Sequence, residues 1–155
     1  MTLQATFPRD RAQQGTLRAF VGQAQVGEWP CLGKADNAKA KAFGNPDRDP
    51  LKQFGDTPIG TWRVRVGTVQ TDIATYGVLA PLTLWPSGGQ AMESHSPTNR
   101  RTGIWIHGGA LNKAGGLRPT YGCIRVHDAT MDAIYALARK HGPIETLETK
   151  ETENV

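Results

Sequence analysis

The chain has 155 residues, of which 38% are apolar, and this length fits one domain with a core of its own. Its net charge is only +4 and its Lys and Arg residues are scattered, so we expect no nucleic-acid partner. No apolar run approaches the roughly 20 residues that span a bilayer, and the N-terminal segment lacks the basic and apolar regions of a secretory signal, so no membrane insertion is expected.

The abundance of glycine and proline, with 18 and 10 residues, predicts a mainly β fold with many turns. Partial alternation of apolar and polar residues predicts three early strand segments, the second of them a hairpin around Gly22: residues 3–8, 17–26 and 29–32. Gly15 and Thr16 mark a turn before the hairpin. A long polar stretch then covers residues 33–56, with a helical turn expected at 38–43.

The clearest strand covers residues 61–66, where Trp62, Val64 and Val66 alternate with polar residues. Three later segments also favour strands: residues 73–84, 103–106 and 123–126. A second long polar loop covers residues 86–102. Because loops of this length are uncommon unless they are functional, we expect at least one of the two to lie beside the functional site.

One principal helix is predicted near the C-terminus. Asp128 is its expected N-cap, apolar residues recur at helical spacing from Met131 to Ala138, and Gly142 followed by Pro143 ends it. Residues 144–149 then favour a last strand, and residues 150–155 a frayed, charged tail.

Two cysteines, Cys31 and Cys123, are too few for a disulfide framework, although one bridge between them stays open. Cys31 lies in a predicted strand and is interpreted as a small core side chain. Cys123 follows Gly122 and precedes Arg125 by two residues. A glycine there permits a sharp turn that presents N–H groups to a developing oxyanion. Since a free thiol has a pKa of about 8.5, a nucleophilic Cys123 needs a base or a positive neighbour.

His107 is the best candidate base because it ends a short apolar strand and precedes Gly108 and Gly109. His127, four residues beyond Cys123, is the second candidate, and a structural histidine is the alternative to both. A zinc site built from His95, His107, His127 and a cysteine has no close ligand pair with metal spacing, so no metal is expected.

These residues stand in a pattern that resembles a known family. The segments 106–109 and 117–126 resemble the signature of YkuD-type L,D-transpeptidase domains: His-Gly, a glycine-rich interval, then Ser or Thr, any residue, Gly and Cys. His107 and Cys123 stand sixteen positions apart, as in the family, and Thr57-Pro58-Ile59-Gly60 resembles the turn that opens these domains. Some members have histidine where this chain has Tyr121.

The resemblance implies a single-domain twisted sheet or sandwich over residues 1–149. It also implies that Cys123 attacks an L,D peptide bond of a peptidoglycan stem peptide, releases D-alanine and forms a thioester. An amine of a second stem peptide or of a D-amino acid then accepts the acyl group. With water as acceptor the same site is that of an L,D-carboxypeptidase or endopeptidase. A toxin that is delivered into another cell would fit this hydrolase alternative. A silent wall-binding domain is disfavoured because His107 and Cys123 are both present.

Further roles follow from position. The N–H groups of Gly122 and Cys123 are candidate oxyanion donors, and Thr120 is the candidate group that orients the imidazole. Candidate substrate-binding residues are Gly108, Arg118, Tyr121 and Arg125, although Arg125 also fits a brace for a neighbouring loop.

Arg100 and Arg101 are expected in a solvated loop, and Trp62 and Trp105 in the core. No cofactor is required, and the family resemblance implies a carbapenem-type β-lactam as covalent inhibitor. It also implies the periplasm or cell wall, while the absence of a visible signal leaves the cytoplasm or a leaderless route open.

Overall fold

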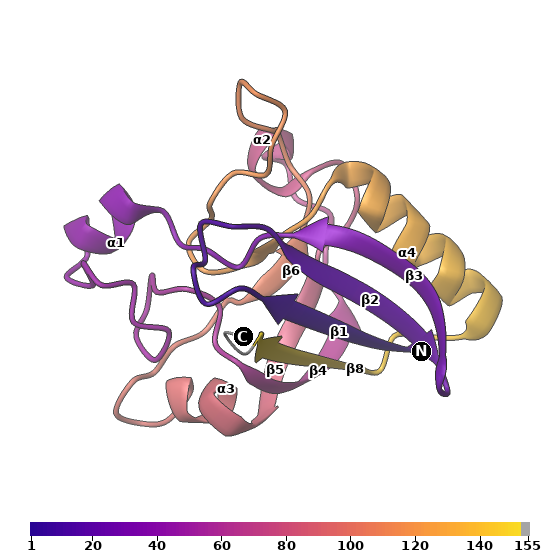
Figure 1. The fold of residues 1–155 in the computed structure, drawn as a ribbon, viewed down its shortest axis with the longest axis horizontal. Helices are drawn as coiled ribbons and strands as arrows, with labels where there is room; N and C mark the ends of the chain where they lie inside the picture. The colour runs from indigo at the N-terminus through magenta and orange to yellow at the C-terminus, as the bar shows by residue number, and fades with distance from the viewer. Residues whose placement is uncertain (153–155) are drawn as a thin grey trace.

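The computed structural model describes residues 1–152 and confirms a mainly β fold with one principal helix near the C-terminus (Figure 1). Eight strands form one sheet in the order β3-β2-β1-β8-β4-β5-β6-β7. The strands are β1 Thr2–Phe7, β2 Gly15–Val21, β3 Ala24–Cys31, β4 Gly60–Val66, β5 Leu82–Gly88, β6 Trp105–His107, β7 Ile124–Arg125 and β8 Thr146–Glu151. The helices are α1 Asn37–Ala42, α2 Ile73–Tyr76, α3 Gly89–Ser94 and α4 Asp128–His141.

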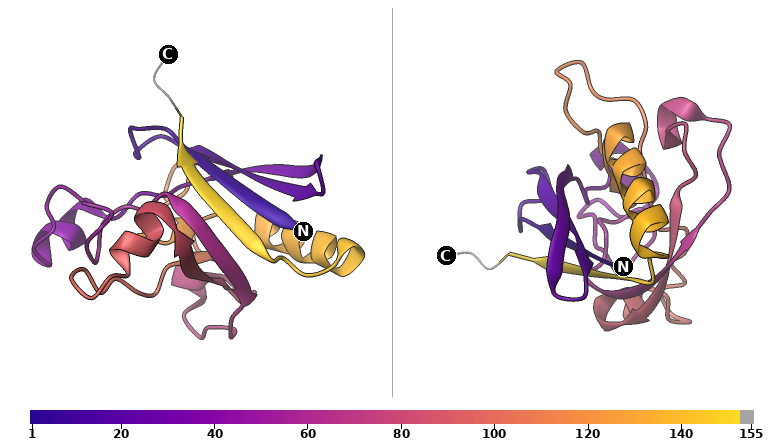
Figure 2. Two further views of the ribbon diagram at one scale, coloured as in Figure 1. Left: turned by 90° about the horizontal axis from the view of Figure 1, so that it is seen from below. Right: turned by 90° about the vertical axis from the view of Figure 1, so that its right-hand side faces the viewer.

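The core lies on the inner face of this curved sheet. In β1 every second residue is buried, namely Leu3, Ala5 and Phe7, and in β2 Leu17 and Ala19 continue the pattern. The long helix α4 contributes Met131 and Ile134 to the same core. Figure 2 shows α4 on the concave side of the curved sheet, between the N-terminal strands and the β4–β5 strands.

The two ends of the sheet meet and nearly close it into a barrel. Leu32, which follows β3, and Arg125 of β7 exchange two backbone hydrogen bonds of 2.9 Å each. Beyond them, Thr120 donates to Lys34 O at 3.1 Å and accepts from Asp36 N at 2.8 Å. Closure of this kind removes the unpaired edges that an open sheet exposes. It also brings the segment before Cys123 against the segment after β3.

Most predicted elements of the first half are confirmed. The hairpin turns at Gly22, which has a φ of 59°, and the expected helical turn is α1. The strand expected at 29–32 is continuous with the second hairpin strand, β3, and is not separate. The turn expected at Gly15 and Thr16 is wrong, because β2 begins at Gly15, which pairs with Cys31, and Thr16 pairs with both Thr6 and Pro30.

The strand expected over residues 73–84 is wrong for its first part, because Ile73–Tyr76 form the short helix α2. The Asp72 carboxylate accepts hydrogen bonds from the Thr75 N–H at 3.2 Å and the Thr75 hydroxyl at 2.6 Å, and Gly77, with a φ of 83°, ends the helix. The loop expected over residues 86–102 is also shorter, since β5 runs to Gly88 and α3 follows.

The C-terminal elements differ in two details. The N-cap of α4 is His127, not Asp128, and the Asp128 carboxylate instead accepts from the Gly109 N–H at 3.0 Å. Strand β8 includes Lys150 and Glu151, which we expected in a frayed tail, because β1 pairs with it in parallel as far as Phe7. Thr152 donates its N–H to Phe7 O at 2.9 Å, and residues 153–155 of the predicted tail lie outside the described part of the chain.

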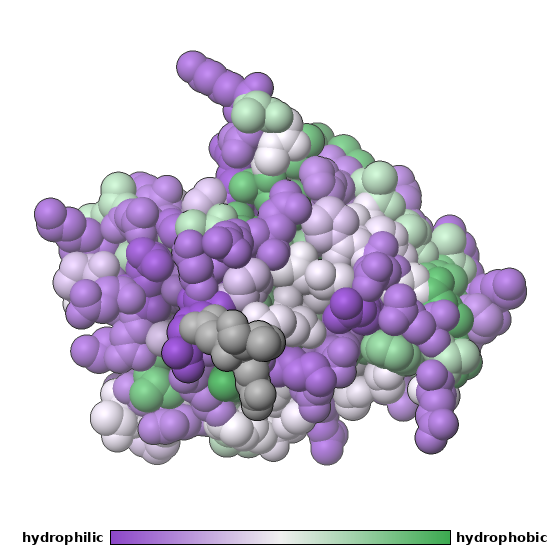
Figure 3. Space-filling view, in the orientation of Figure 1, coloured by the Kyte–Doolittle hydropathy of each residue, from purple (hydrophilic) through white to green (hydrophobic). Residues whose placement is uncertain are grey.

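The two cysteines are free thiols. Cys31 is fully buried, which confirms its interpretation as a core side chain, and burial raises the pKa of its thiol to about 12. No helix within residues 1–152 is long and apolar enough to cross a membrane. The face shown in Figure 3 is mostly hydrophilic, with small and separated apolar patches.

We expect Leu17→Ala to lower the free energy of unfolding by about 2–5 kcal/mol, because Leu17 is 0% exposed at the centre of the core and the smaller side chain leaves a cavity. Urea denaturation followed by circular dichroism measures this loss. Val69→Ala is the matched control, since Val69 is 59% exposed and its truncation removes little packing. Equal effects of the two substitutions would contradict the assignment of the core.

Candidate active site

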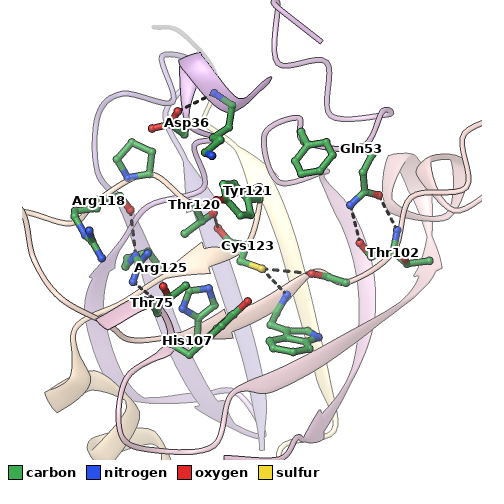
Figure 4. Close-up of a pocket in the computed structure, with 16 residues that line it drawn as sticks. Asp36, Gln53, Thr75, Thr102, His107, Arg118, Thr120, Tyr121, Cys123 and Arg125 are labelled. Carbon is green, nitrogen blue, oxygen red and sulfur yellow. Dashed lines mark hydrogen bonds between the residues drawn. The ribbon is translucent and has the colours of Figure 1, made fainter. Parts of the chain in front are cut away.

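The pairing of β6 with β7 brings the chemically interesting residues onto one face. These two strands are parallel, with Ile106 opposite Ile124 and His107 opposite Arg125. Both isoleucines are fully buried in the core. Since successive side chains point to opposite faces of a strand, the flanking residues point the other way. Four of them line a pocket of about 500 Å³: Trp105, His107, Cys123 and Arg125 (Figure 4).

Cys123 presents its sulfur to this pocket while the residue is only 9% exposed. The Trp105 N–H donates to Sγ at 3.3 Å, and the thiol donates to Gly103 O at 3.4 Å. Burial raises the pKa of the Cys123 thiol, whereas the Trp105 N–H and then the charges of Arg101 and Arg125 act in the opposite direction. Because burial dominates, the resting group at neutral pH is a thiol, which needs a base to become a nucleophile.

His107 is suited to be that base. It is 2% exposed, and its Nδ1 lies 2.8 Å from Gly108 O. A carbonyl can only accept, so Nδ1 carries the hydrogen and Nε2 holds the basic lone pair. Burial first, and the Arg125 charge second, lower the pKa of His107 to about 4 against the opposing effect of the Gly108 and Thr75 carbonyls. The ring is therefore neutral at pH 7 and free to accept a proton.

Arg125 supports the carbonyl that orients His107. Its Nη1 donates to Gly108 O at 2.6 Å and to Thr75 O at 2.8 Å, and its Nε donates to Arg118 O at 3.1 Å. Gly108 O thus accepts from both the imidazole and the guanidinium. Gly108 itself does not line the pocket. The observed contacts of Arg125 are those of a brace, which was the alternative to substrate binding.

Thr120 shapes the turn before Cys123. Its hydroxyl accepts from the Gly122 N–H at 3.0 Å and donates to Cys123 O at 2.8 Å. Thr120 therefore does not contact the imidazole, and Gly108 O takes the orienting position that we expected for it. The Gly122 N–H is already bonded within the turn, so the backbone N–H of Cys123 remains as the candidate oxyanion donor.

Arg118 and Tyr121, two further substrate-binding candidates, form part of the pocket wall. Arg118 donates from Nε to Ala110 O at 2.8 Å and from Nη2 to Ala74 O at 2.9 Å. The Tyr121 ring meets Phe54 edge-on at 5.8 Å between centroids, and Phe54 stacks on Phe43 at 4.2 Å. The rim of the pocket is therefore aromatic on this side.

Several lining residues were not identified from the sequence. Tyr76 of α2 packs its ring edge against His107, with 5.0 Å between centroids. The two long polar loops also reach the pocket, through Asp36, Lys39, Gln53, Phe54 and Thr102. These residues belong to no periodic pattern or motif in the sequence. Only the length and polarity of the two loops indicated a functional role.

Two expectations about buried residues need correction. Arg101, expected in a solvated loop, is almost fully buried, and Trp105, expected in the core, is half-buried on the pocket wall. Trp62 does lie in the core, where its Nε1 donates to Thr149 Oγ1 at 3.0 Å.

The other histidines lie elsewhere. His127 caps α4 outside the pocket, and His95 Nδ1 lies 2.9 Å from Arg101 O beside a smaller, neighbouring cavity. Among residues 1–152, no three His, Cys, Asp or Glu side chains are close enough together to hold a metal ion.

The family model of the L,D-transpeptidase catalytic domain (YkuD) matches residues 9–145, and the chain therefore belongs to this family. No curated protein matches the chain.

Two solved structures are similar. The helical cell shape determining protein Pgp2 from Campylobacter jejuni is 16% identical with a TM-score of 0.57, and the match covers 99% of this chain and 49% of that one. L,D-transpeptidase 1 from Mycobacterium tuberculosis is 11% identical with a TM-score of 0.40, over 95% of this chain and 60% of that one. The chain thus spans about half the length of the first protein, and the likeness to Pgp2 is one of fold.

We expect the burial of neutral His107 to make the protein less stable in acid. The unfolded chain binds a proton below a pKa of about 6.5, whereas folded His107 does so only near 4, so stability is retained above pH 6.5 and lost as the pH falls toward 4. The loss attributable to His107 is about 3 kcal/mol.

Urea denaturation of wild type and His107→Gln at pH 7, 5 and 4 measures this loss of stability. His127→Gln is the control for losing an imidazole outside the pocket. A wild-type pH dependence in His107→Gln would contradict the buried, neutral state of His107.

Proposed function

We propose that this member of the L,D-transpeptidase family is an enzyme that transfers acyl groups on peptidoglycan stem peptides, with Cys123 as nucleophile and His107 as general base. One observation carries the proposal: a neutral imidazole and a thiol project from neighbouring strands into one pocket. Residues 1–149, together with the end of β8, make up the proposed catalytic domain.

In the first half-reaction, His107 Nε2 accepts the thiol proton while Cys123 Sγ attacks the carbonyl carbon of the L,D peptide bond. The backbone N–H of Cys123 stabilises the oxyanion of the tetrahedral intermediate. As the C–N bond breaks, the imidazolium gives its proton to the departing amine of D-alanine, and a thioester remains on Cys123.

In the second half-reaction, an acceptor amine attacks the thioester carbonyl carbon. His107 accepts a proton from the attacking nitrogen, a new amide forms, and the departing sulfur recovers a proton from the imidazolium. Both Arg118 and Arg125 donate to backbone carbonyls, but Arg125 is 3% exposed whereas Arg118 is only partly buried, so Arg118 is the better candidate for holding a substrate carboxylate.

The surroundings of Cys123 favour an amine over water as acceptor. The two long loops are hydrogen-bonded to each other at the pocket, through Gln53 Nε2 to Thr102 O at 3.3 Å and Thr102 N to Gln53 Oε1 at 3.2 Å (Figure 4). We propose that this contact, together with the aromatic rim, limits the access of water to an acyl group on Cys123 and so slows its hydrolysis. Water as the acceptor is the alternative outcome of the experiment below.

We expect Cys123→Ala to abolish turnover of a stem tetrapeptide and Cys31→Ala to leave most of it, because only the first removes the nucleophile. Mass spectrometry of the products, with and without an amine acceptor, measures both the rate and the reaction type. Release of D-alanine with an acyl product on the amine indicates transfer, and a free tripeptide indicates hydrolysis. Turnover by folded Cys123→Ala would refute the proposal.

We expect His107→Ala to lower the rate by about 10²–10⁴, the usual contribution of a positioned general base. His127→Ala, outside the pocket, should cost far less. Steady-state kinetics of the two variants under matched conditions decide whether His107 or His127 is the base. A larger loss of rate in His127→Ala would assign the role to His127.

We expect a carbapenem-type β-lactam to acylate Cys123, since its strained ring presents an electrophilic carbonyl to the sulfur. Intact-protein mass before and after incubation detects the adduct, and peptide mapping places it. Cys123→Ala is the control and should keep its mass. An unmodified mass in active wild-type enzyme would mean that the pocket does not admit the ring.

A further inference from the structure

Arg101 is a buried arginine that the proposed mechanism does not use. It is 2% exposed and directly precedes Thr102 and Gly103, which line the pocket. Among residues 1–152 no carboxylate forms a salt bridge with it. The nearby Asp56 carboxylate is bonded to the Ala35 N–H and to Arg48. A buried charge without an ion pair is costly, so its retention needs a reason.

The guanidinium of Arg101 holds one of the two long loops. Nη1 donates to Pro50 O at 2.6 Å and to Asp56 O at 2.7 Å, and Nη2 donates to Gly55 O at 2.5 Å. Within this same segment, Gln53 and Phe54 line the pocket, and Phe54 has a φ of 64°, which is unusual for a bulky residue. Such a conformation persists only where the surroundings impose it. The planar, multidentate contact of Arg101 is one such constraint.

The guanidinium of Arg101 also contacts the turn that carries the nucleophile. A Cβ atom added to Gly122 would clash with Arg101 Nη2 and with Gly55 O. Gly122 also has a φ of 111°, so both its conformation and its contacts require glycine. Arg101 therefore contacts both the loop at residues 50–56 and the Gly122–Cys123 turn, at the place where these two segments meet.

The charge of Arg101 also acts on the thiol. Of the two cations that lower the pKa of Cys123, Arg101 has the larger effect and Arg125 the smaller. Burial lowers the pKa of Arg101 itself to about 10, against the opposing effect of Cys123 first and of Asp56 and Asp49 next, so Arg101 stays charged at pH 7. The other ionisable side chains that line the pocket are Asp36, Lys39, Tyr76, His107, Arg118 and Tyr121.

We infer that Arg101 is a positioning residue of this site: its guanidinium clamps residues 50–56 against the Gly122–Cys123 turn and supplies buried positive charge that stabilises the Cys123 thiolate. The inference rests on the proposed function, because it assigns Arg101 a part in forming the nucleophile. Its two components, the clamp and the charge, are separable by substitution. Lysine keeps the charge without the planar fork, and glutamine keeps a donor without the charge.

The test is the pH profile of Cys123 alkylation by iodoacetamide in Arg101→Gln, Arg101→Lys and wild type, followed by intact-protein mass and peptide mapping. Buried Cys31 serves as the internal unreactive thiol. We expect Arg101→Gln to shift the profile upward by about one pH unit, which lowers the rate at pH 7 about tenfold. Arg101→Lys should keep a profile close to wild type but speed amide hydrogen exchange across residues 50–56. Arg100→Gln, at the exposed neighbour, should change neither the alkylation profile nor the exchange across residues 50–56.

An unchanged alkylation profile in folded Arg101→Gln would overturn the charge component, and unchanged exchange across residues 50–56 in Arg101→Lys would overturn the clamp. If Arg101→Gln does not fold, Arg101→Lys still tests the clamp, and wild-type exchange across residues 50–56 in that variant would overturn the inference, which requires both components. Alkylation requires no peptide substrate. A wild type that does not turn over stem peptides but shows Arg101-dependent alkylation would therefore refute the proposed function and leave the role of Arg101 standing.

Discussion

The hydrogen bonds that close the sheet are the constraint on which the rest of the structure depends. Strand β7 has only two residues and β6 three, too few to position a reactive site alone. The paired bonds between Leu32 and Arg125, and those that join Lys34 and Asp36 to Thr120, bind this short pair to the long hairpin of β2 and β3. Backbone groups on both edges of β7 are thereby paired, and the turn before Cys123 is held along its length.

Burial explains the electrostatics of the site. His107 and Cys123 are buried where they line the pocket, and burial disfavours the charged form of each, so both the imidazole and the thiol are neutral. Within residues 1–152, the two arginines whose charge acts on Cys123, Arg101 and Arg125, are bonded to backbone carbonyls and not to carboxylates. Their charge is therefore not neutralised by an ion pair and remains available to a developing thiolate or oxyanion.

Carbonyl groups, rather than acidic side chains, organise this pocket. Gly108 O accepts from both His107 and Arg125, and Gly55 O accepts from Arg101. A guanidinium fork suits this task because its donors lie in one plane and can reach several carbonyls at once. The close approach of backbone to guanidinium leaves no room for a Cβ atom at Gly109 or Gly122, which accounts for glycine at these two positions.

The sequence by itself determined the features that depend on local pattern. Alternation predicted β1, the hairpin at Gly22 and β4. The resemblance of segments 106–109 and 117–126 to the YkuD signature predicted the family, which the family model confirms, and made His107 and Cys123 the candidate catalytic pair. Only the tertiary structure decided which partners these residues have. Arg125 bonds to Thr75, fifty positions away, and Arg101 to Gly55, forty-six away. Nothing local distinguishes those carbonyls from others, because a carbonyl becomes a partner only when the closed sheet brings it within reach. For the same reason the burial of Arg101 and the bracing contacts of Arg125 followed from the fold and not from the residues around them.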